Sequence, residues 1–198
     1  MNRFDIPKLV EAQSSLRRRK EMLVALLRPL RSGVVSGLTQ ILAEGTAAGL
    51  EGLTQLQITR EADDYFEATL SLGLFRLVMV STDQVWFADL LEDVLASKIF
   101  FCIADHHDGR PVAVITLQEA PNDQVVSSAK WFSSDGPKWL AGNTPVSPDN
   151  ATSIGSSLAG ALAAHFLAFQ GSWNDLLTLA GLKSSETVRR DIGFKLQP

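Results

Sequence analysis

The sequence predicts an α/β fold of the α+β kind, in which a mostly antiparallel sheet is flanked by helices and preceded by a helical extension. Three observations predict it. Apolar residues recur at helical spacing over residues 7–28. The period changes after residue 53: apolar residues alternate with polar residues over 56–70, as is typical of half-buried strands, and form a nearly continuous run at 74–80. Residues 152–169 return to a helical pattern rich in glycine, alanine and serine.

The first predicted element is a helix over residues 7–28. Pro7 suits its first turn, whereas Pro29 is expected to end or kink it. Leucines recur every seven residues, and Arg19 interrupts the intermediate position. These leucines are Leu9, Leu16, Leu23 and Leu30. The spacing predicts one short packing stripe, either across a homodimer formed through residues 7–28 or against the protein's own core.

Glycines recur through residues 33–52, so we expect a short helix at 38–44 followed by a flexible link. The change in period after this link places a domain boundary there. The predicted organisation is an N-terminal helical extension at 1–52 and an α/β domain at 53–198.

The elements of the α/β domain follow one another in sequence. We expect strands at 56–58, 66–70, 74–80, 98–104, 111–117 and 124–132, and a helix at 89–97. His106 and His107 fall in a turn between two strands, where the next pair, Asp108-Gly109, favours a hairpin. Residues 133–151 are rich in glycine, proline, serine and asparagine and are predicted to form a long loop, a kind of segment that often carries function.

The composition indicates a soluble, cytoplasmic protein with a substantial core. Hydrophobic residues make up 45% of the chain and charged residues 20%. We expect no membrane span, because no apolar run reaches about 18 residues, and no secretory signal at the start of the chain. A single cysteine, Cys102, excludes an internal disulfide and a cysteine zinc cluster. No metal and no cofactor are expected.

The net charge of −4 is unevenly distributed. Residues 1–31 contain eight lysines or arginines and three acids, a net charge of +5, which leaves −9 for the rest of the chain. A basic helix on an acidic body binds either an acidic partner or its own body.

Several features of residues 72–170 resemble the toxin-activating lysine acyltransferases of the RTX family. The first is Leu72-Gly73, which seven residues separate from a serine-containing turn, Ser81-Thr82-Asp83-Gln84-Val85. A Pro-Val-Ala strand at 111–113 and a segment from Lys138-Trp139 to Asp149-Asn150 follow in the family's order. The resemblance implies a GNAT-like fold and transfer of a fatty acyl group from acyl carrier protein to a lysine.

Such a transfer needs a base to deprotonate the lysine amine. The family's histidine position falls on Val85, and its aspartate position falls near Gly142, so the catalytic pair that the resemblance implies is missing. His106, His107 and Asp149 are weak substitutes, because the histidines lie in a turn and Asp149 suits a helix cap.

Four residues of or beside the predicted loop are candidates for binding: Trp131, Lys138, Trp139 and Asn150. The two tryptophans either line a groove or close the core. Acyl carrier protein is a candidate partner, although a body of charge −9 would repel an acidic protein. A local basic patch is one way to receive it, made of Arg76, Lys98, Arg110, Lys130 and Lys138.

The tail at 179–192 is similar to the turn and recognition helix of a helix-turn-helix. A capped terminal helix explains the same residues as well. We do not expect nucleic acid to be the main partner. Three functional hypotheses follow. The first is a catalytically silent relative of the toxin-activating acyltransferases that acts as a protein-binding or assembly protein. The second is an active, divergent acyltransferase, and the third is a DNA-associated regulator.

Overall fold

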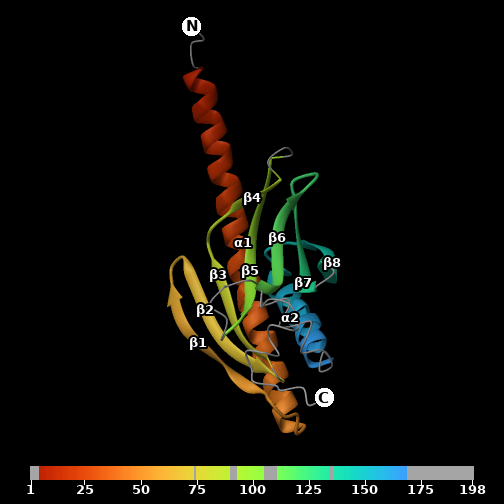
Figure 1. Cartoon of the computed structure of the whole chain (residues 1–198). Helices are drawn as coiled ribbons and strands as arrows, with labels where there is room; N and C mark the ends of the chain where they lie inside the picture. Colours follow the sequence, from red (N-terminus) through yellow and green to blue (C-terminus); the bar gives the residue numbers. More distant parts are fainter. Residues whose placement is uncertain (1–4, 74, 90–92, 105–110, 134–135, 169–198) are drawn as a thin grey trace, which may run out of the picture.

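The computed structural model describes residues 5–73, 75–89, 93–104, 111–133 and 136–168. These residues form a mixed α/β structure with an N-terminal helix, an open antiparallel sheet and a second helix after the sheet (Figure 1). The predicted mixed class, with an antiparallel sheet and helices on either side of it in the sequence, is confirmed.

The N-terminal helix α1 spans Ile6–Ala47. Asp5 caps it, because its carboxylate accepts a hydrogen bond from the Lys8 backbone N–H at 3.4 Å. The helix continues through Pro29, so the prediction of an end at 28 and of a separate helix at 38–44 was wrong. Leu27 and Leu30 are fully buried on either side of this proline, and that packing outweighs the backbone hydrogen bond that a proline cannot donate.

The sheet contains eight strands within the described part of the chain, and every pairing is antiparallel. Their order across the sheet is β1-β2-β3-β5-β6-β7-β8, with β4 paired only to β5. The strands are β1 (Thr54–Ala62), β2 (Tyr65–Leu72), β3 (Phe75–Thr82), β4 (Trp86–Asp89), β5 (Val94–Ile103), β6 (Pro111–Ala120), β7 (Gln124–Ser133) and β8 (Gly136–Val146).

Two sequence predictions fail in this sheet. The helix predicted at 89–97 is wrong, since β5 begins at Val94 and buries Leu95 against the core. The long loop predicted at 133–151 is also wrong, because most of it is strand β8. Its prolines suggested a loop, but an edge strand tolerates proline where no ladder partner needs the missing N–H.

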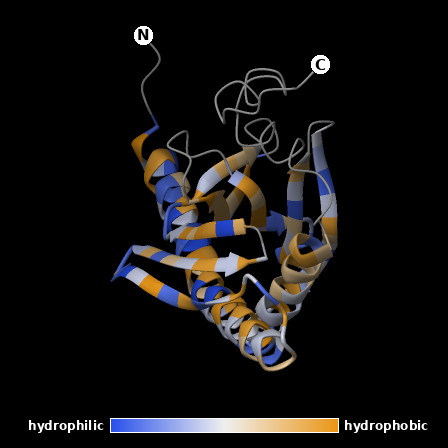
Figure 2. Cartoon of the chain, turned by 60° about the horizontal axis from the view of Figure 1, so that its bottom comes forward, coloured by the Kyte–Doolittle hydropathy of each residue, from blue (hydrophilic) through white to orange (hydrophobic). Residues whose placement is uncertain are grey.

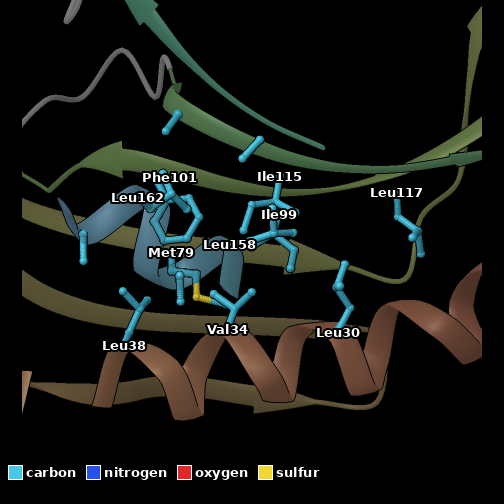
Figure 3. Close-up of a cluster of buried hydrophobic side chains, with 14 of the residues drawn as sticks. Leu30, Val34, Leu38, Met79, Ile99, Phe101, Ile115, Leu117, Leu158 and Leu162 are labelled. Carbon is cyan, nitrogen blue, oxygen red and sulfur yellow. The ribbon is translucent and has the colours of Figure 1, made fainter. Parts of the chain in front are cut away.

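Both helices cover the same face of the sheet (Figure 3). From α1, Leu30, Val34 and Leu38 point toward the strands, and they belong to one buried cluster with strand residues on either side. The labelled strand members of that cluster are Met79, Ile99, Phe101, Ile115 and Leu117. This single core joins residues from both sides of the boundary predicted at 52.

The alternation of polar and apolar residues along the strands follows from this one-sided cover, and Figure 2 shows it as alternating colour bands. In β2, for example, Phe66, Ala68, Leu70 and Leu72 are buried and the residues between them are half-buried. Successive strand side chains point to opposite faces, so one covered face produces a period of two.

The second helix, α2 (Ala151–Ala168), lies at the position predicted at 152–169. It crosses α1 at glycines on both helices. A Cβ at Gly155 would lie 2.2 Å from the Leu30 carbonyl oxygen, and one at Gly33 would lie 2.0 Å from that of Thr152. The Ser156 hydroxyl donates a hydrogen bond to the Gly33 carbonyl oxygen at 3.0 Å. Gly155 and Ser156 of α2 therefore fit closely against the backbone of α1.

Candidate functional site

The first turns of α1 extend beyond the sheet (Figure 1). Residues 5–15 are all exposed, and the first fully buried residue of the helix is Leu23. Three large aliphatic side chains on these turns face solvent: Ile6 is 67% exposed, Leu9 55% and Val10 56%. We call residues 5–15 the projecting segment and residues 16–22, where α1 reaches the body, the root.

An ion-pair cluster fixes the root to the sheet. Arg19 donates to both carboxylate oxygens of Glu119, at 2.8 and 2.6 Å, and to the side chain of Asp93 at 2.9 Å. Burial alone would raise the pKa of Glu119, but hydrogen bonds from Arg19 and from the Leu95 N–H outweigh it and hold the pKa below its usual value. The hydrogen bonds of Arg19 to Glu119 and Asp93 raise the pKa of Arg19 despite its partial burial.

A second cluster holds the middle of α1. Arg28 donates two hydrogen bonds to one oxygen of Asp83, at 3.0 and 2.6 Å. Arg31 lies 3.8 Å from the other oxygen, and its guanidinium lies 5.1 Å from the centre of the Phe66 ring. Burial lowers the pKa of Arg31, although Asp83 opposes this shift. Three cations of the basic helix therefore pair with the acidic body of the same chain.

The remaining charges of the helix surround the root. Arg17 pairs with Glu21 at 2.8 Å on the same helix, while Arg18 and Lys20 are exposed. Because Arg17 to Lys20 are four consecutive residues, their side chains point in all directions around the helix axis. At the tip, Asp5 lies 3.1 Å from Lys8, so the tip carries no comparable excess of positive charge.

The two positions that the acyltransferase resemblance implied are far apart in the sheet. Val85 lies between β3 and β4 and packs against the core, and Gly142 is exposed on β8. Strands β5, β6 and β7 separate them. Asp149 is exposed just before α2, and His106 and His107 lie outside the described residues. The structure therefore does not bring Val85 and Gly142 together.

The four binding candidates are also divided. Trp131 is buried on the helix-covered face, with its ring centre 4.3 Å from that of His165. Trp139 lies on the opposite face and is 57% exposed, with the Lys130 ammonium 3.8 Å from its ring centre. These two tryptophans therefore do not line one groove. Lys138 is exposed on β8 opposite Trp131 in the strand register.

Asn150 has a structural role at the start of α2. Its side-chain oxygen accepts a hydrogen bond from the Ser147 N–H at 2.7 Å, and its own carbonyl accepts one from the Ile154 N–H at 2.9 Å. Its side chain therefore closes the turn that precedes α2, and its backbone carbonyl accepts a hydrogen bond from the first turn of the helix.

Three residues of the predicted basic patch share the open face of the sheet, although Arg76 lies beside Ala104, six residues along the chain from Lys98. Arg76, Lys98 and Lys130 occupy positions of β3, β5 and β7 that face away from the helices, as the strand register shows. Arg110 lies outside the described residues. Cys102 lies on the same face, and burial raises the pKa of its thiol, which disfavours the nucleophilic thiolate.

An open cleft of about 980 Å³ lies beside the root, lined among others by Arg18, Met22, Gln118, Asn122 and Asn143. In the described ranges, histidine, cysteine and acidic side chains form no cluster of three or more that would suit a metal ion.

Helices α1 and α2 are each long and apolar enough to cross a membrane by length and composition, and under half of the most apolar 18-residue stretch of each helix is buried. This result fits either a membrane or an aqueous location, so the cytoplasmic location stays a prediction.

Comparison with protein-family models, with curated proteins and with solved structures found no match to this chain. The relation to the toxin-activating acyltransferases is therefore a hypothesis from the sequence alone. The site with the clearest geometry is the projecting segment, where apolar side chains stand outside the body on a helix that the body holds firmly.

Proposed function

We propose that this protein is a binding and assembly protein that associates through the projecting segment of α1, with a second copy of itself as the partner. The observation that carries the proposal is the exposure of Ile6, Leu9 and Val10 on a helix that is well anchored below them. Apolar side chains gathered on an exposed surface mark a place of association, because association removes them from water.

The segment continues a pattern that is buried elsewhere in the same helix. Leu9, Leu16 and Leu23 are spaced seven residues apart, and their exposure falls along the helix from Leu9, which is exposed, to Leu23, which is fully buried. This row of leucines is therefore buried inside the body and becomes exposed where α1 leaves the body. Its buried end packs within the chain, and its exposed end is available to another helix.

As an isolated peptide, the projecting segment would not stay helical in water, because isolated helices shorter than about 12–15 residues are marginal. Here the segment grows from a helix that Arg19 and Leu23 fix to the body. A partner therefore meets a preformed helix and need not order it, which lowers the cost of binding.

The role does not depend on acyl transfer. It agrees with Val85 and Gly142 at the positions where the acyltransferase resemblance would place a histidine and an aspartate. Activity as an acyltransferase gains no support from the placement of these residues, and the tail on which the DNA hypothesis rests lies outside the described residues.

The test is the mass of the protein in solution as a function of concentration, measured by sedimentation velocity. The projecting segment, residues 5–15, is about 15 Å long at 1.5 Å per residue, so an interface formed through it belongs to the small, weak class. We therefore expect the wild-type protein to move from monomer toward dimer as its concentration rises through the micromolar range and above.

Two variants sharpen this test. Leu9→Glu places a charge in the apolar stripe and should leave the protein monomeric, whereas Ser15→Glu adds the same charge on another side of the segment and should leave association unchanged. Both residues are exposed, so both variants should keep the wild-type circular dichroism spectrum. A wild-type protein that stays monomeric, or a Leu9→Glu variant that associates as well as Ser15→Glu, would contradict the proposal.

A further inference from the structure

We infer that the open face of the sheet is a docking site for the chain's own C-terminal segment, residues 169–198. The inference goes beyond the proposed self-association and concerns the side of the sheet that faces away from α1 and α2. It follows from an apolar band on this face, from the place where α2 ends, and from the sequence and charge of the segment.

An apolar band crosses the centre of the open face. Val80 of β3 pairs with Phe100 of β5, which pairs in turn with Val114 of β6. Val78 lies on the same face, two residues before Val80. The helices cover the other face, toward which alternate residues of these strands such as Met79 point (Figure 3). Val78, Val80 and Phe100 are therefore only half-buried, and a further layer on this face would remove them from water.

Helix α2 ends beside one end of the sheet, from which the open face is within reach. The Phe166 ring centre lies 5.3 Å from that of Phe75, the first residue of β3, and the His165 ring centre lies 4.3 Å from that of Trp131 near the end of β7. After Ala168 the chain continues for 30 residues, from 169 to 198. Packed layers lie about 10 Å apart, so a chain that passes from the layer of α2 to the open face travels about 20 Å, which about six extended residues span.

The sequence of the segment predicts a short amphipathic helix at 173–180. Ser172 suits its N-cap, with Asp175 three residues later, and Gly181 suits the position just after its end. One side of this helix is apolar, at spacings of three and four residues: Trp173, Leu176, Leu177 and Ala180. A helix this short needs an apolar surface to pack on. The helix-covered face of the sheet already packs against α1 and α2, whereas the open face offers the band.

The charges beside the band favour this segment over the basic helix of a second copy. Lys98 lies two residues from Phe100 on β5, and Lys130 pairs with Val114. The predicted helix carries one charge, the carboxylate of Asp175, so the lysines do not repel it. The N-terminal 31 residues of a second copy carry a net charge of +5 and would be repelled.

The reactivity of Cys102 tests the inference, because this residue is the only cysteine of the chain and pairs with Val78 on the open face. The full-length protein is treated with a maleimide under native conditions, and the labelling rate is followed by intact mass. Leu177→Glu places a charge on the apolar side of the predicted helix, and Thr178→Glu places the same charge on its other side. Because labelling reports how often the face is uncovered, Leu177→Glu should raise the rate about tenfold or more, and Thr178→Glu should leave it within about twofold of wild type.

The outcomes separate the segment from other covers. Equal labelling rates in wild type, Leu177→Glu and Thr178→Glu would overturn the inference. A wild-type rate that falls as the protein concentration rises would show that a second copy covers the face, and would also overturn it. If Leu177→Glu loses the wild-type circular dichroism spectrum, the milder Leu176→Gln replaces it under the same expectation of faster labelling. Leu9→Glu should leave the labelling rate unchanged, so this inference and the proposed self-association can fail independently.

Discussion

Substitution of Gly155 by alanine should destabilise the protein, whereas the same substitution five residues later should not. A Cβ at Gly155 would lie 2.2 Å from the Leu30 carbonyl oxygen and 2.9 Å from the Val34 nitrogen, both of them backbone atoms of α1. At Gly160 a Cβ would meet nothing within 4 Å. The two sites share one helix and one substitution, so they differ only in what the new methyl group contacts.

The contact distances set the magnitude. To reach ordinary van der Waals separation, α2 must move from α1 by about 1 Å, and gaps of that size forfeit roughly a quarter to a half of each contact's dispersion energy. Overpacking of this kind costs about 3 kcal/mol where rigid backbone is the obstacle. Alanine recovers about 1 kcal/mol of helix propensity. We therefore expect Gly155→Ala to lower the free energy of unfolding by about 2 kcal/mol, and Gly160→Ala to raise it by up to about 1 kcal/mol.

Urea unfolding followed by tryptophan fluorescence measures both variants. The expected difference of about 3 kcal/mol between the two variants would also appear in thermal unfolding, as a difference of roughly 6–12 °C in Tm at this chain length. If Gly155→Ala proved as stable as Gly160→Ala, the close crossing of α1 and α2 would be refuted, and with it the way in which the body holds α1.

Two further predictions concern the anchoring of α1. Pro29→Ala restores a backbone donor in the middle of the helix and should raise the free energy of unfolding by about 1–3 kcal/mol, measured by urea unfolding. A loss of stability would instead show that the packing of the proline ring stabilises the helix more than the missing hydrogen bond destabilises it. The depressed pKa of Glu119 gives stability that is present above the ordinary glutamate pKa of about 4.3 and is lost as the pH falls through the lower pKa of the folded state. Arg19→Met should therefore lower stability at neutral pH and flatten its decline between about pH 5 and pH 3, with Arg17→Met, whose partner lies on α1 itself, as the control.

The parts of the fold that the sequence predicted are those in which burial leaves a strict period. In β2 one face is covered by the helices, and this cover shows in the sequence as alternation. The helix predicted at 89–97 failed because Val94 and Leu95, taken with their neighbours, fit a helical stripe and a short strand equally well. The pairing of β5 with β3 and β6, which decides the matter, is a contact between distant parts of the chain.

Local signals were overruled by packing and strand pairing in two other places. Pro29 is a strong helix terminator in isolation, but Leu27 and Leu30 lie in the core on either side of it and keep α1 continuous. Strand β8 has the composition of a loop, yet its pairing with β7 runs from Val146 to Gly136. At Pro29 the stabilising contacts come from the core, which contains strands far away in the sequence. Strand β8 pairs with the strand just before it, and the composition of β8 alone does not show that pairing.

The candidate site shows the same limit in another form. The heptad of leucines predicted a packing stripe but left open whether it packed within the chain or against a partner. The two ends of this row of leucines differ in the structure, because Leu23 is buried in the body and Leu9 is exposed. What separates them is the point at which the sheet ends beside the helix, marked by Arg19 and its partners Glu119 and Asp93. An apolar stripe in a sequence thus becomes a binding site only where the rest of the chain leaves it uncovered, and that boundary is a property of the assembled fold.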